Sequence, residues 1–209
     1  MVRILITGDF CPIARAEEMT LKGRFEVLFN DFLAIIRNSD LAITNLECPL
    51  TNAKNSISKI GPAIKASPET AKLLTYAGFK LVTLANNHIM DYGPEGLNST
   101  IKILDEHKIS HVGAGNTLEE AKRPFKTVIN GKSISIINLA ENEFSTTHGN
   151  LPGANPLDLT KNFYAIKKEK KQNDIVIVIY HGGNEEYNLP SPRLKETLRY
   201  FVEAGASAV

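Results

Sequence analysis

The chain has 209 residues, of which 43% are hydrophobic and 22% charged, and its 24 basic and 23 acidic side chains leave a formal net charge of +1. This balance excludes the basic face with which proteins hold a phosphate backbone, so we expect no nucleic-acid partner. No stretch approaches the ~20 apolar residues of a membrane span, and the N-terminus lacks the apolar core of a signal peptide. We therefore expect a cytoplasmic protein with one domain over residues 1–209, whose two cysteines suit a reducing compartment.

Short β-branched runs alternate with helical patterns along the chain, which is typical of an α/β fold with a largely parallel sheet. The predicted strands are Val2–Thr7, Leu41–Asn45, Lys80–Ala85, Ser133–Leu139 and Ile175–Tyr180. Apolar spacing and helix start signals predict helices over Phe25–Arg37, after Ser67-Pro68-Glu69, from Pro94, and from Ser191-Pro192 to a stop at Gly205.

The second half of the chain carries three further signals. Asn130-Gly131 between two apolar runs predicts a β-hairpin, so we expect a mixed, mostly parallel sheet with antiparallel pairing in this half. Thr147–Pro156 is rich in glycine and proline and is predicted to be a long surface loop. Ala206–Val209 has the pattern of a strand that is only beginning, so we expect the domain to be truncated at its C-terminus.

Polar side chains follow four of the predicted strands. Asp9 comes after the first strand, Glu47 after the second, Asn87 and His88 after the third, and His181 after the last. In open α/β sheets, ligands bind beyond the carboxyl ends of the strands. The sequence therefore predicts that these five side chains form one functional cluster.

Each of these positions also has a purely structural interpretation. Asp9 follows a glycine after a strand, which is often only a turn, and Glu47 could be a solvated loop carboxylate or a helix cap. Asn86 or Asn87 could cap a turn, because asparagine tolerates left-handed backbone geometry. A single histidine is more often structural than catalytic, but His88 and His181 each come directly after a buried strand.

Two carboxylates, an amide and two imidazoles at one sheet edge would be costly to bury without partners, and a pair of divalent metal ions would satisfy them. Oxygen and imidazole ligands suit Mn²⁺, Zn²⁺ or Fe²⁺, and Glu47 is placed to bridge two such ions. Other chemistry has less support, because the chain lacks a Walker loop, a G-x-G-x-x-G after the first strand and a G-x-S-x-G elbow. A nucleophile pair of Cys11 with a histidine stays open, although nothing in the sequence orients it.

Five segments distributed over nearly the whole chain carry a family pattern: ITGDF, DLAITNLECPLT, GFKLVTLANNHIMDYGPEGLNSTIKIL, GAGNTLEEAKRP and IVIVIYHGGNEEYNLPSPR. Together they resemble the bacterial capsule-synthesis proteins of the CapA type, and LANNHIMDYG is the most specific of them. That family is associated with poly-γ-glutamate capsules and looks related to the calcineurin-like metallophosphoesterases. The resemblance implies a layered α/β sandwich with a two-metal site.

The resemblance also implies roles for single residues. Asp9 corresponds to a metal ligand after the first strand, and Glu47 stands where the superfamily usually has a bridging aspartate. Asn87 and His181 correspond to further metal ligands, and His88 corresponds to the catalytic histidine.

Further residues are expected near the substrate, namely Arg15, Asn86, Asp91 and Glu185. For Arg15, a surface salt bridge is the open alternative to binding an anionic substrate.

The chain departs from the superfamily pattern in two places. Cys11 replaces the histidine of the superfamily's Asp-x-His motif, and it is either a soft replacement ligand or a small buried side chain. The family also continues into a strand with further ligands, which would lie beyond Val209.

We expect a metal-dependent hydrolase acting on phosphate esters and linked to capsule or poly-γ-glutamate synthesis. The alternative is a non-catalytic capsule-assembly component that binds an anionic polymer or a partner protein in the same cleft. A third possibility is a shortened chain that keeps the fold without the activity, because missing ligands would lower its metal affinity. The sequence leaves the oligomeric state and the exact substrate unknown.

Overall fold

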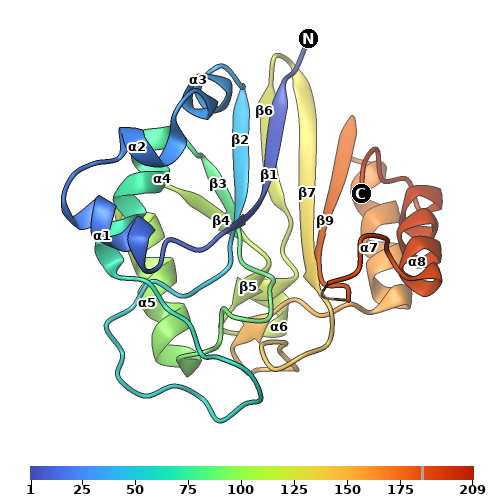
Figure 1. Cartoon of the computed structure of the whole chain (residues 1–209). Coiled ribbons are helices and arrows are strands. Elements are labelled where there is room, and N and C mark those ends of the chain that lie inside the picture. Colours follow the sequence, from blue (N-terminus) through green and yellow to red (C-terminus); the bar gives the residue numbers. More distant parts are fainter. Residues whose placement is uncertain (185) are drawn as a thin grey trace.

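The computed structural model describes residues 1–184 and 186–209, so Glu185 lies outside the described residues. Two β-sheets pack face to face, and helices cover the outer face of each sheet (Figure 1). This arrangement confirms the predicted layered α/β sandwich with a mixed, mostly parallel set of strands. Within the described residues, no helix is both long enough and apolar enough to cross a membrane.

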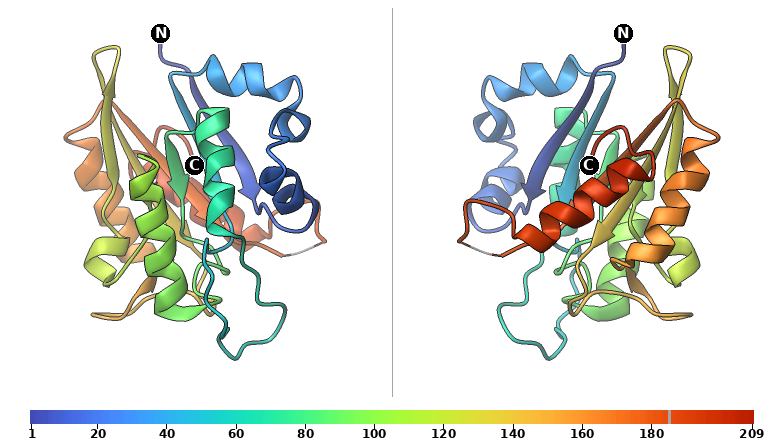
Figure 2. Two further views of the ribbon diagram at one scale, coloured as in Figure 1. Left: turned by 90° about the vertical axis from the view of Figure 1, so that its left-hand side faces the viewer. Right: turned by 90° about the vertical axis from the view of Figure 1, so that its right-hand side faces the viewer.

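The first sheet consists of four parallel strands in the order β1-β2-β3-β4. Their bounds are Ile4–Phe10 for β1, Leu41–Leu46 for β2, Leu81–Thr83 for β3 and Ser110–Val112 for β4. Helices from the first half of the chain cover its outer face (Figure 2). They are α1 (Arg15–Leu21), α2 (Glu26–Phe29), α3 (Phe32–Arg37), the 3₁₀ turn η1 (Pro68–Thr70), α4 (Ala71–Ala77) and α5 (Gly93–Glu106).

The second sheet has the order β6-β7-β9, with β6 antiparallel to β7 and β7 parallel to β9. Its strands are β6 (Phe125–Ile129), β7 (Lys132–Ala140) and β9 (Ile175–His181), and its outer face carries α7 (Leu159–Lys170) and α8 (Pro192–Glu203). A small antiparallel pair, β5 (Ala114–Gly115) with β8 (Gly153–Ala154), and the short helix α6 (Leu118–Ala121) complete the elements.

Alternation along the strands divides the core into three layers. In β2, Leu41 and Ile43 face the second sheet, whereas Ala42 packs against the helices of the first half. In β9, Ile177 faces the first sheet, whereas Val178 packs against α7 and α8. The odd-numbered residues of both strands therefore point into the space between the sheets, and this parity determines which polar residues meet at the strand ends.

Three local predictions are confirmed. Asn130 and Gly131 both have positive φ, of 50° and 75°, as the two-residue turn between β6 and β7 requires. Ser191 caps α8 by accepting a hydrogen bond from Leu194 N. Ala208 forms a parallel bridge to Ile177, so Ala206–Val209 begins to pair with β9 as expected for a strand.

Other local predictions are wrong or incomplete. Phe25–Arg37 is not one helix, because Asn30 adopts φ of 47° and separates α2 from α3. Strand β1 extends to Phe10 rather than ending at Thr7, because a bulge keeps its last residues paired with β2. The predicted loop Thr147–Pro156 includes β8, which pairs with β5.

Asp174 joins the starts of β7 and β9, and its substitution gives a pH-dependent prediction. Its carboxylate accepts hydrogen bonds from Ser133 N at 2.9 Å, from Ser133 Oγ at 2.8 Å and from Lys132 Nζ at 3.0 Å. These bonds hold the pKa of Asp174 well below its ordinary value of 3.8. Because the folded-state pKa is depressed, this stabilisation is present above about pH 4 and is lost as the pH falls through the folded-state pKa.

We expect Asp174→Asn to lower the melting temperature at pH 7, and the difference from the wild-type protein to shrink steadily below pH 4. Thermal unfolding followed by circular dichroism between pH 2 and pH 7 measures this difference. Asp31→Asn is the matched control, since the Asp31 side chain caps no helix N–H. A difference that stays constant over the whole pH range would show that the carboxylate charge is not what stabilises this corner.

Candidate metal centre

Asp9 reaches the space between the sheets through the bulge in β1. The register of β1 with β2 runs from Ile4 opposite Leu41 to Ile6 opposite Ile43, and it then shifts so that Asp9 lies opposite Asn45. With an unshifted register, Gly8 would lie opposite Asn45 and Asp9 would point to the helix side. The inserted residue therefore turns the carboxylate of Asp9 toward the second sheet.

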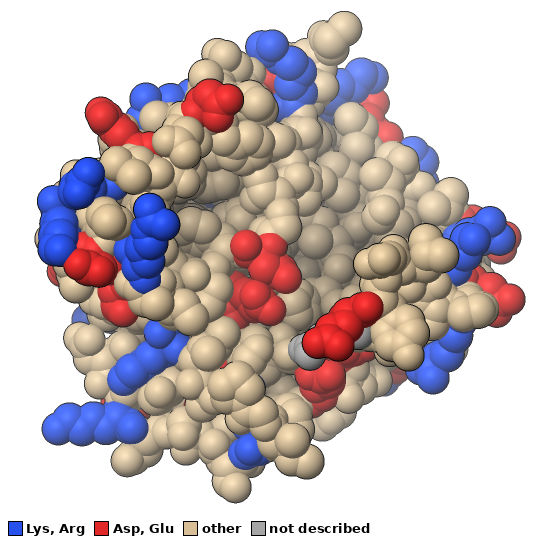
Figure 3. Space-filling view, in the orientation of Figure 1, with Lys and Arg blue, Asp and Glu red and all other residues tan. Residues whose placement is uncertain are grey.

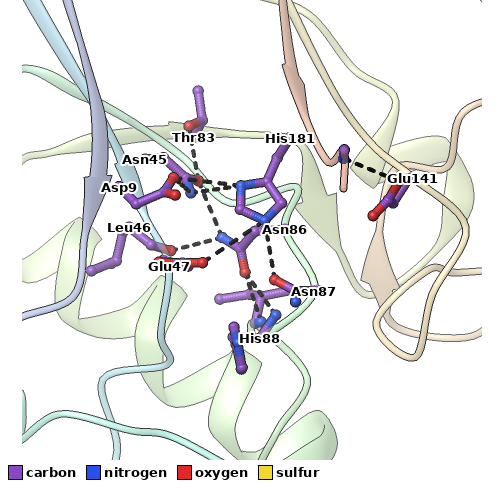
Figure 4. A network of polar contacts seen from close by, with 12 residues as sticks. Asp9, Asn45, Leu46, Glu47, Thr83, Asn86, Asn87, His88, Glu141 and His181 are labelled. Carbon is purple, nitrogen blue, oxygen red and sulfur yellow. Dashed lines mark hydrogen bonds and ion pairs between the residues drawn. The ribbon is translucent and has the colours of Figure 1, made fainter. Parts of the chain in front are cut away.

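Asn45 is the central hydrogen-bonding residue of the site. It is an odd-numbered residue of β2, it is buried, and its Nδ2 donates to Asp9 Oδ1 at 2.7 Å and lies 3.2 Å from His181 Nδ1. Its Oδ1 accepts hydrogen bonds from Thr83 Oγ1 at 3.1 Å and from Asn86 Nδ2 at 3.2 Å (Figure 4). One amide thus holds groups from β1, β3 and β9 in a common position.

His181 enters the same space from the second sheet, because it continues the odd-numbered face of β9. Its Nδ1 lies 3.5 Å from Asp9 Oδ1, and its Nε2 lies 3.9 Å from Glu47 Oε1 and 3.0 Å from Asn87 Oδ1. Burial lowers the pKa of His181, but its contact with Asp9 and the charges of Asp9, Glu47 and Glu141 outweigh burial and raise the pKa above its ordinary value. The contact with His181 in turn lowers the pKa of Asp9.

Asp9, Glu47 and His181 form a group that could hold a cation, because each offers a ligand atom within 4.8 Å of the other two. The Asp9 side chain is 50% exposed and that of Glu47 22%, so the group opens to solvent. On the face of the molecule seen in Figure 3, acidic side chains gather near the centre, and lysine and arginine lie mainly toward the rim. Two carboxylates this close repel one another, and a cation between them would offset that repulsion.

The donor set fits a divalent transition metal. Glu47, Asn87 and His181 bring a carboxylate oxygen, an amide oxygen and an imidazole nitrogen to one point, and Asp9 adds a second carboxylate. Such mixed oxygen and nitrogen ligands suit Mn²⁺, Zn²⁺ and Fe²⁺. The residues present therefore fit the kind of ion expected from the sequence.

His88 lies beside this group in a tight turn between β3 and α5. Asn86 Oδ1 accepts hydrogen bonds from His88 N at 3.1 Å and Ile89 N at 2.9 Å, and Asn86 Nδ2 donates to Leu46 O at 2.9 Å. His88 Nδ1 lies 2.7 Å from Asp91 Oδ2, and the ring is 15% exposed. The turn therefore presents one partly accessible imidazole next to the candidate ligands, with Asp91 behind it.

Two residues expected at the substrate occupy other positions. Asn86 is fully buried and its amide bonds protein groups on both sides, as the turn-capping alternative proposed. Asp91 is also fully buried, and its two oxygens accept hydrogen bonds from Lys59, His88 and Ile64. We therefore assign Asn86 and Asp91 to shaping and orienting the turn rather than to substrate contact.

The remaining candidates lie at the edge of the site or outside it. Arg15 is the exposed first residue of α1 and takes no part in the network drawn in Figure 4. The Cys11 thiol is hydrogen-bonded with Cys48, which lowers the pKa of Cys11 and raises that of Cys48, and within the described residues Cys11 is not part of the candidate ligand group. Glu185 lies outside the described residues.

The sequence alone did not reveal two important residues. Asn45 is the last residue of the predicted strand Leu41–Asn45, and only its odd number, shared with Glu47, indicates that both side chains lie on the same face. Lys59 lies in the irregular segment 51–66, far from the motifs, and its burial against Asp91 follows only from the path of that segment (Figure 1).

Comparison with solved structures places this fold among those of phosphatases. A putative 5'-nucleotidase from Staphylococcus aureus, solved in complex with alpha-ketoglutarate, aligns with a TM-score of 0.54 at 16% identity, over 97% of this chain and 43% of that one. A phosphatase from Mycoplasma pneumoniae aligns with a TM-score of 0.52 at 17% identity, over 97% of this chain and 59% of that one. The chain therefore shares the fold of these two proteins.

The sequence family is more specific. Residues 3–209 match the model of the bacterial capsule synthesis protein family PGA_cap, and the chain belongs to that family. The capsule biosynthesis protein CapA of Bacillus anthracis is 31% identical over 98% of this chain and 52% of its own length. The PGA biosynthesis protein CapA of Bacillus subtilis is 30% identical over 97% of this chain and 54% of its own length. The chain thus spans about half the length of these curated relatives.

Substitution of Asn45 tests whether this residue orients the metal ligands or only stabilises the fold. We expect Asn45→Ala to weaken Mn²⁺ binding by about 10–100-fold, the usual cost of losing a group that orients metal ligands. It should also lower the free energy of unfolding by about 1–3 kcal/mol, because Thr83 and Asn86 lose a buried partner. Isothermal titration calorimetry and urea unfolding measure the two effects.

The matched control for Asn45→Ala is Asn162→Ala. Asn162 is 6% exposed, against 7% for Asn45, and it accepts a hydrogen bond from Asp158 N at the start of α7. The control should lose stability and keep its Mn²⁺ affinity. Equal loss of affinity in both variants would mean that Asn45 supports only the fold.

Proposed function

We propose that this chain is a metal-dependent phosphoesterase-like hydrolase linked to capsule or poly-γ-glutamate synthesis. The observation that carries the proposal is the convergence of Asp9, Glu47 and His181, each with a ligand atom within 4.8 Å of the others, beside a partly accessible imidazole of His88. Membership of the PGA_cap family supports the biological context, and the phosphoesterase fold supports the reaction class.

We propose that two ions would share these ligands. Asn87 and His181 would hold one ion with Glu47, and Asp9 would hold the other with the same carboxylate, so that Glu47 bridges them. When bound, Mn²⁺, Zn²⁺ or Fe²⁺ supplies a Lewis acid for phosphoryl oxygens and lowers the pKa of water. Asn45 holds Asp9 and His181 in place for this role.

His88 acts in the proposal as the general acid. Asp91 accepts a hydrogen bond from its Nδ1, so the proton given to the departing alcohol oxygen is the second one, which the imidazolium form of the ring carries on Nε2. The carboxylate of Asp91 stays behind the ring and fixes its orientation, so the proton passes from His88 and not from Asp91.

A second candidate function is that of a non-catalytic assembly component that binds an anionic polymer. It is favoured by the names of relatives, such as the probable polyglutamine synthesis accessory protein of Mycobacterium tuberculosis, which is 26% identical over 87% of this chain. Without metal ions, Asp9 and Glu47 would repel a polyanion and a phosphate ester alike, and a non-catalytic component would have no use for the partly accessible His88 imidazole beside them. We therefore place the hydrolase first.

Hydrolysis of p-nitrophenyl phosphate and of bis(p-nitrophenyl) phosphate with added Mn²⁺ tests the two functions. The hydrolase predicts turnover that depends on Mn²⁺ and is lost on chelation. Calorimetric binding of poly-γ-glutamate without any phosphoester turnover would instead support the assembly component and overturn the hydrolase.

A further inference from the structure

Lys59 is a buried lysine that the roles proposed so far leave without a function. It lies in the segment 51–66, which connects β2 to η1 without a helix or strand and extends along the lower edge of the view in Figure 1. Its side chain is only 4% exposed, and its ammonium group forms an ion pair with Asp91, whose side chain is fully buried. Burying a lysine costs free energy unless its charge is paired, and the ion pair with Asp91 offsets that cost for Lys59.

The contacts of Asp91 show what this pair does to the neighbouring histidine. Asp91 Oδ1 accepts a hydrogen bond from Lys59, and Oδ2 accepts one from Ile64 N at 2.8 Å and faces His88 Nδ1 at 2.7 Å. An ionised carboxylate can only accept hydrogen bonds. The proton between Asp91 and His88 therefore resides on Nδ1, which leaves Nε2 for the reacting side of the ring.

Lys59 acts on His88 through Asp91 and not by a hydrogen bond of its own. Its Nζ lies 3.2 Å from His88 Nδ1, but both atoms are donors when Nδ1 carries its proton. The Phe144 ring lies 5.9 Å from the same ammonium group and forms a cation–π contact with it. These contacts fix the position of the lysine, and its positive charge there favours the ionised form of Asp91, which can only accept hydrogen bonds.

We infer that Lys59 is a positioning residue, which holds Asp91 as an ionised acceptor and thereby fixes the His88 ring with its proton on Nδ1 and Nε2 directed to the substrate. The inference rests on the proposed hydrolase function for its catalytic consequence. The tautomer and orientation of His88 do not depend on that function, so they can be tested separately.

A merely structural lysine would anchor the segment 51–66 without affecting His88. Lys65 provides the matched control, because it lies in the same segment, donates a hydrogen bond to Ala53 O and contacts the ring of Tyr92 at 4.7 Å. Lys65→Met removes an anchor of this segment while leaving the contacts of Asp91 intact. Lys59→Gln serves as a second variant that keeps a donor near Asp91 without the charge, in case Lys59→Met does not fold.

The first experiment compares leaving groups. A poor leaving group such as phenolate needs a well-placed acid more than p-nitrophenolate does. With Mn²⁺ present, we expect Lys59→Met and Lys59→Gln to lower kcat for phenyl phosphate at least ~10-fold more than kcat for p-nitrophenyl phosphate, while Lys65→Met affects both equally. Equal losses for the two substrates in the Lys59 variants would overturn the positioning role.

The second experiment needs no activity. Long-range ¹H–¹⁵N correlation spectra of the metal-free protein, recorded where His88 is neutral, report which ring nitrogen carries the proton. We expect the Nδ1–H form in the wild-type protein and in Lys65→Met, and a mixture of both forms in the Lys59 variants. An unchanged Nδ1–H form in those variants contradicts the inference, whereas a wild-type protein that shows this form but no turnover contradicts only the hydrolase function.

Discussion

Replacing His88 by alanine should lower kcat for phenyl phosphate by about 10²–10⁴-fold, the range expected when a general acid is lost. The loss should be smaller for p-nitrophenyl phosphate, because its leaving group departs without a proton. Mn²⁺ affinity should stay near that of the wild-type protein, since His88 Nδ1 is turned toward Asp91 and the ring is not part of the candidate ligand group. Steady-state kinetics and calorimetry measure the two properties.

His107→Ala is the matched control for His88→Ala. His107 follows α5 and its Nδ1 lies 3.0 Å from Ile103 O, so it is a histidine with a local structural contact. The control variant should retain full turnover. Retention of activity in His88→Ala would remove this residue from the mechanism, and an equal loss for both leaving groups would mean that it is not the acid.

Glu47→Gln should have the second large effect, a loss of Mn²⁺ affinity of more than ~100-fold. Losing a supporting group costs about 10–100-fold, and a shared ligand should cost more. The substitution keeps the shape of the side chain but removes the charge that both ions would share.

Glu141→Gln is the matched control for Glu47→Gln. Glu141 directly follows β7, where its carboxylate accepts a hydrogen bond from Gly183 N at 3.2 Å, and it is not among the candidate ligands found in the described residues. Calorimetric titration with Mn²⁺ should show nearly unchanged affinity for this variant. If Glu141→Gln weakens binding as much as Glu47→Gln, general negative potential and not coordination attracts the ion.

Much of the candidate site could be predicted from the sequence because strand ends in an α/β sheet converge. The continuous apolar run before His181 and the strand before Glu47 placed both residues correctly at one edge, where the structure brings them to 3.9 Å. The strand pattern did not include the bulge in β1, because a bulge inserts one residue without changing the composition of the strand. Without that bulge, Asp9 would point away from the other ligands.

The residues that support the site could not be predicted, because their roles depend on contacts between distant parts of the chain. Asp91 lies just beyond Asn87 and His88 in the sequence, where a carboxylate that faces the substrate would be expected. Only the path of segment 51–66 shows that Lys59 and Ile64 cover Asp91. The division of Phe25–Arg37 into two helices has a different, local origin. The spacing of apolar residues favours one helix there. It contains no information about the positive φ of Asn30, which interrupts the helix.

Anomalous diffraction from crystals soaked with Mn²⁺ tests the metal centre most directly. The arrangement of ligands predicts an anomalous difference peak in contact with the carboxylate of Glu47, with Asn87 Oδ1 and with the ring of His181. No peak at this position, at a Mn²⁺ concentration that supports hydrolysis, would contradict the assignment of these residues as metal ligands.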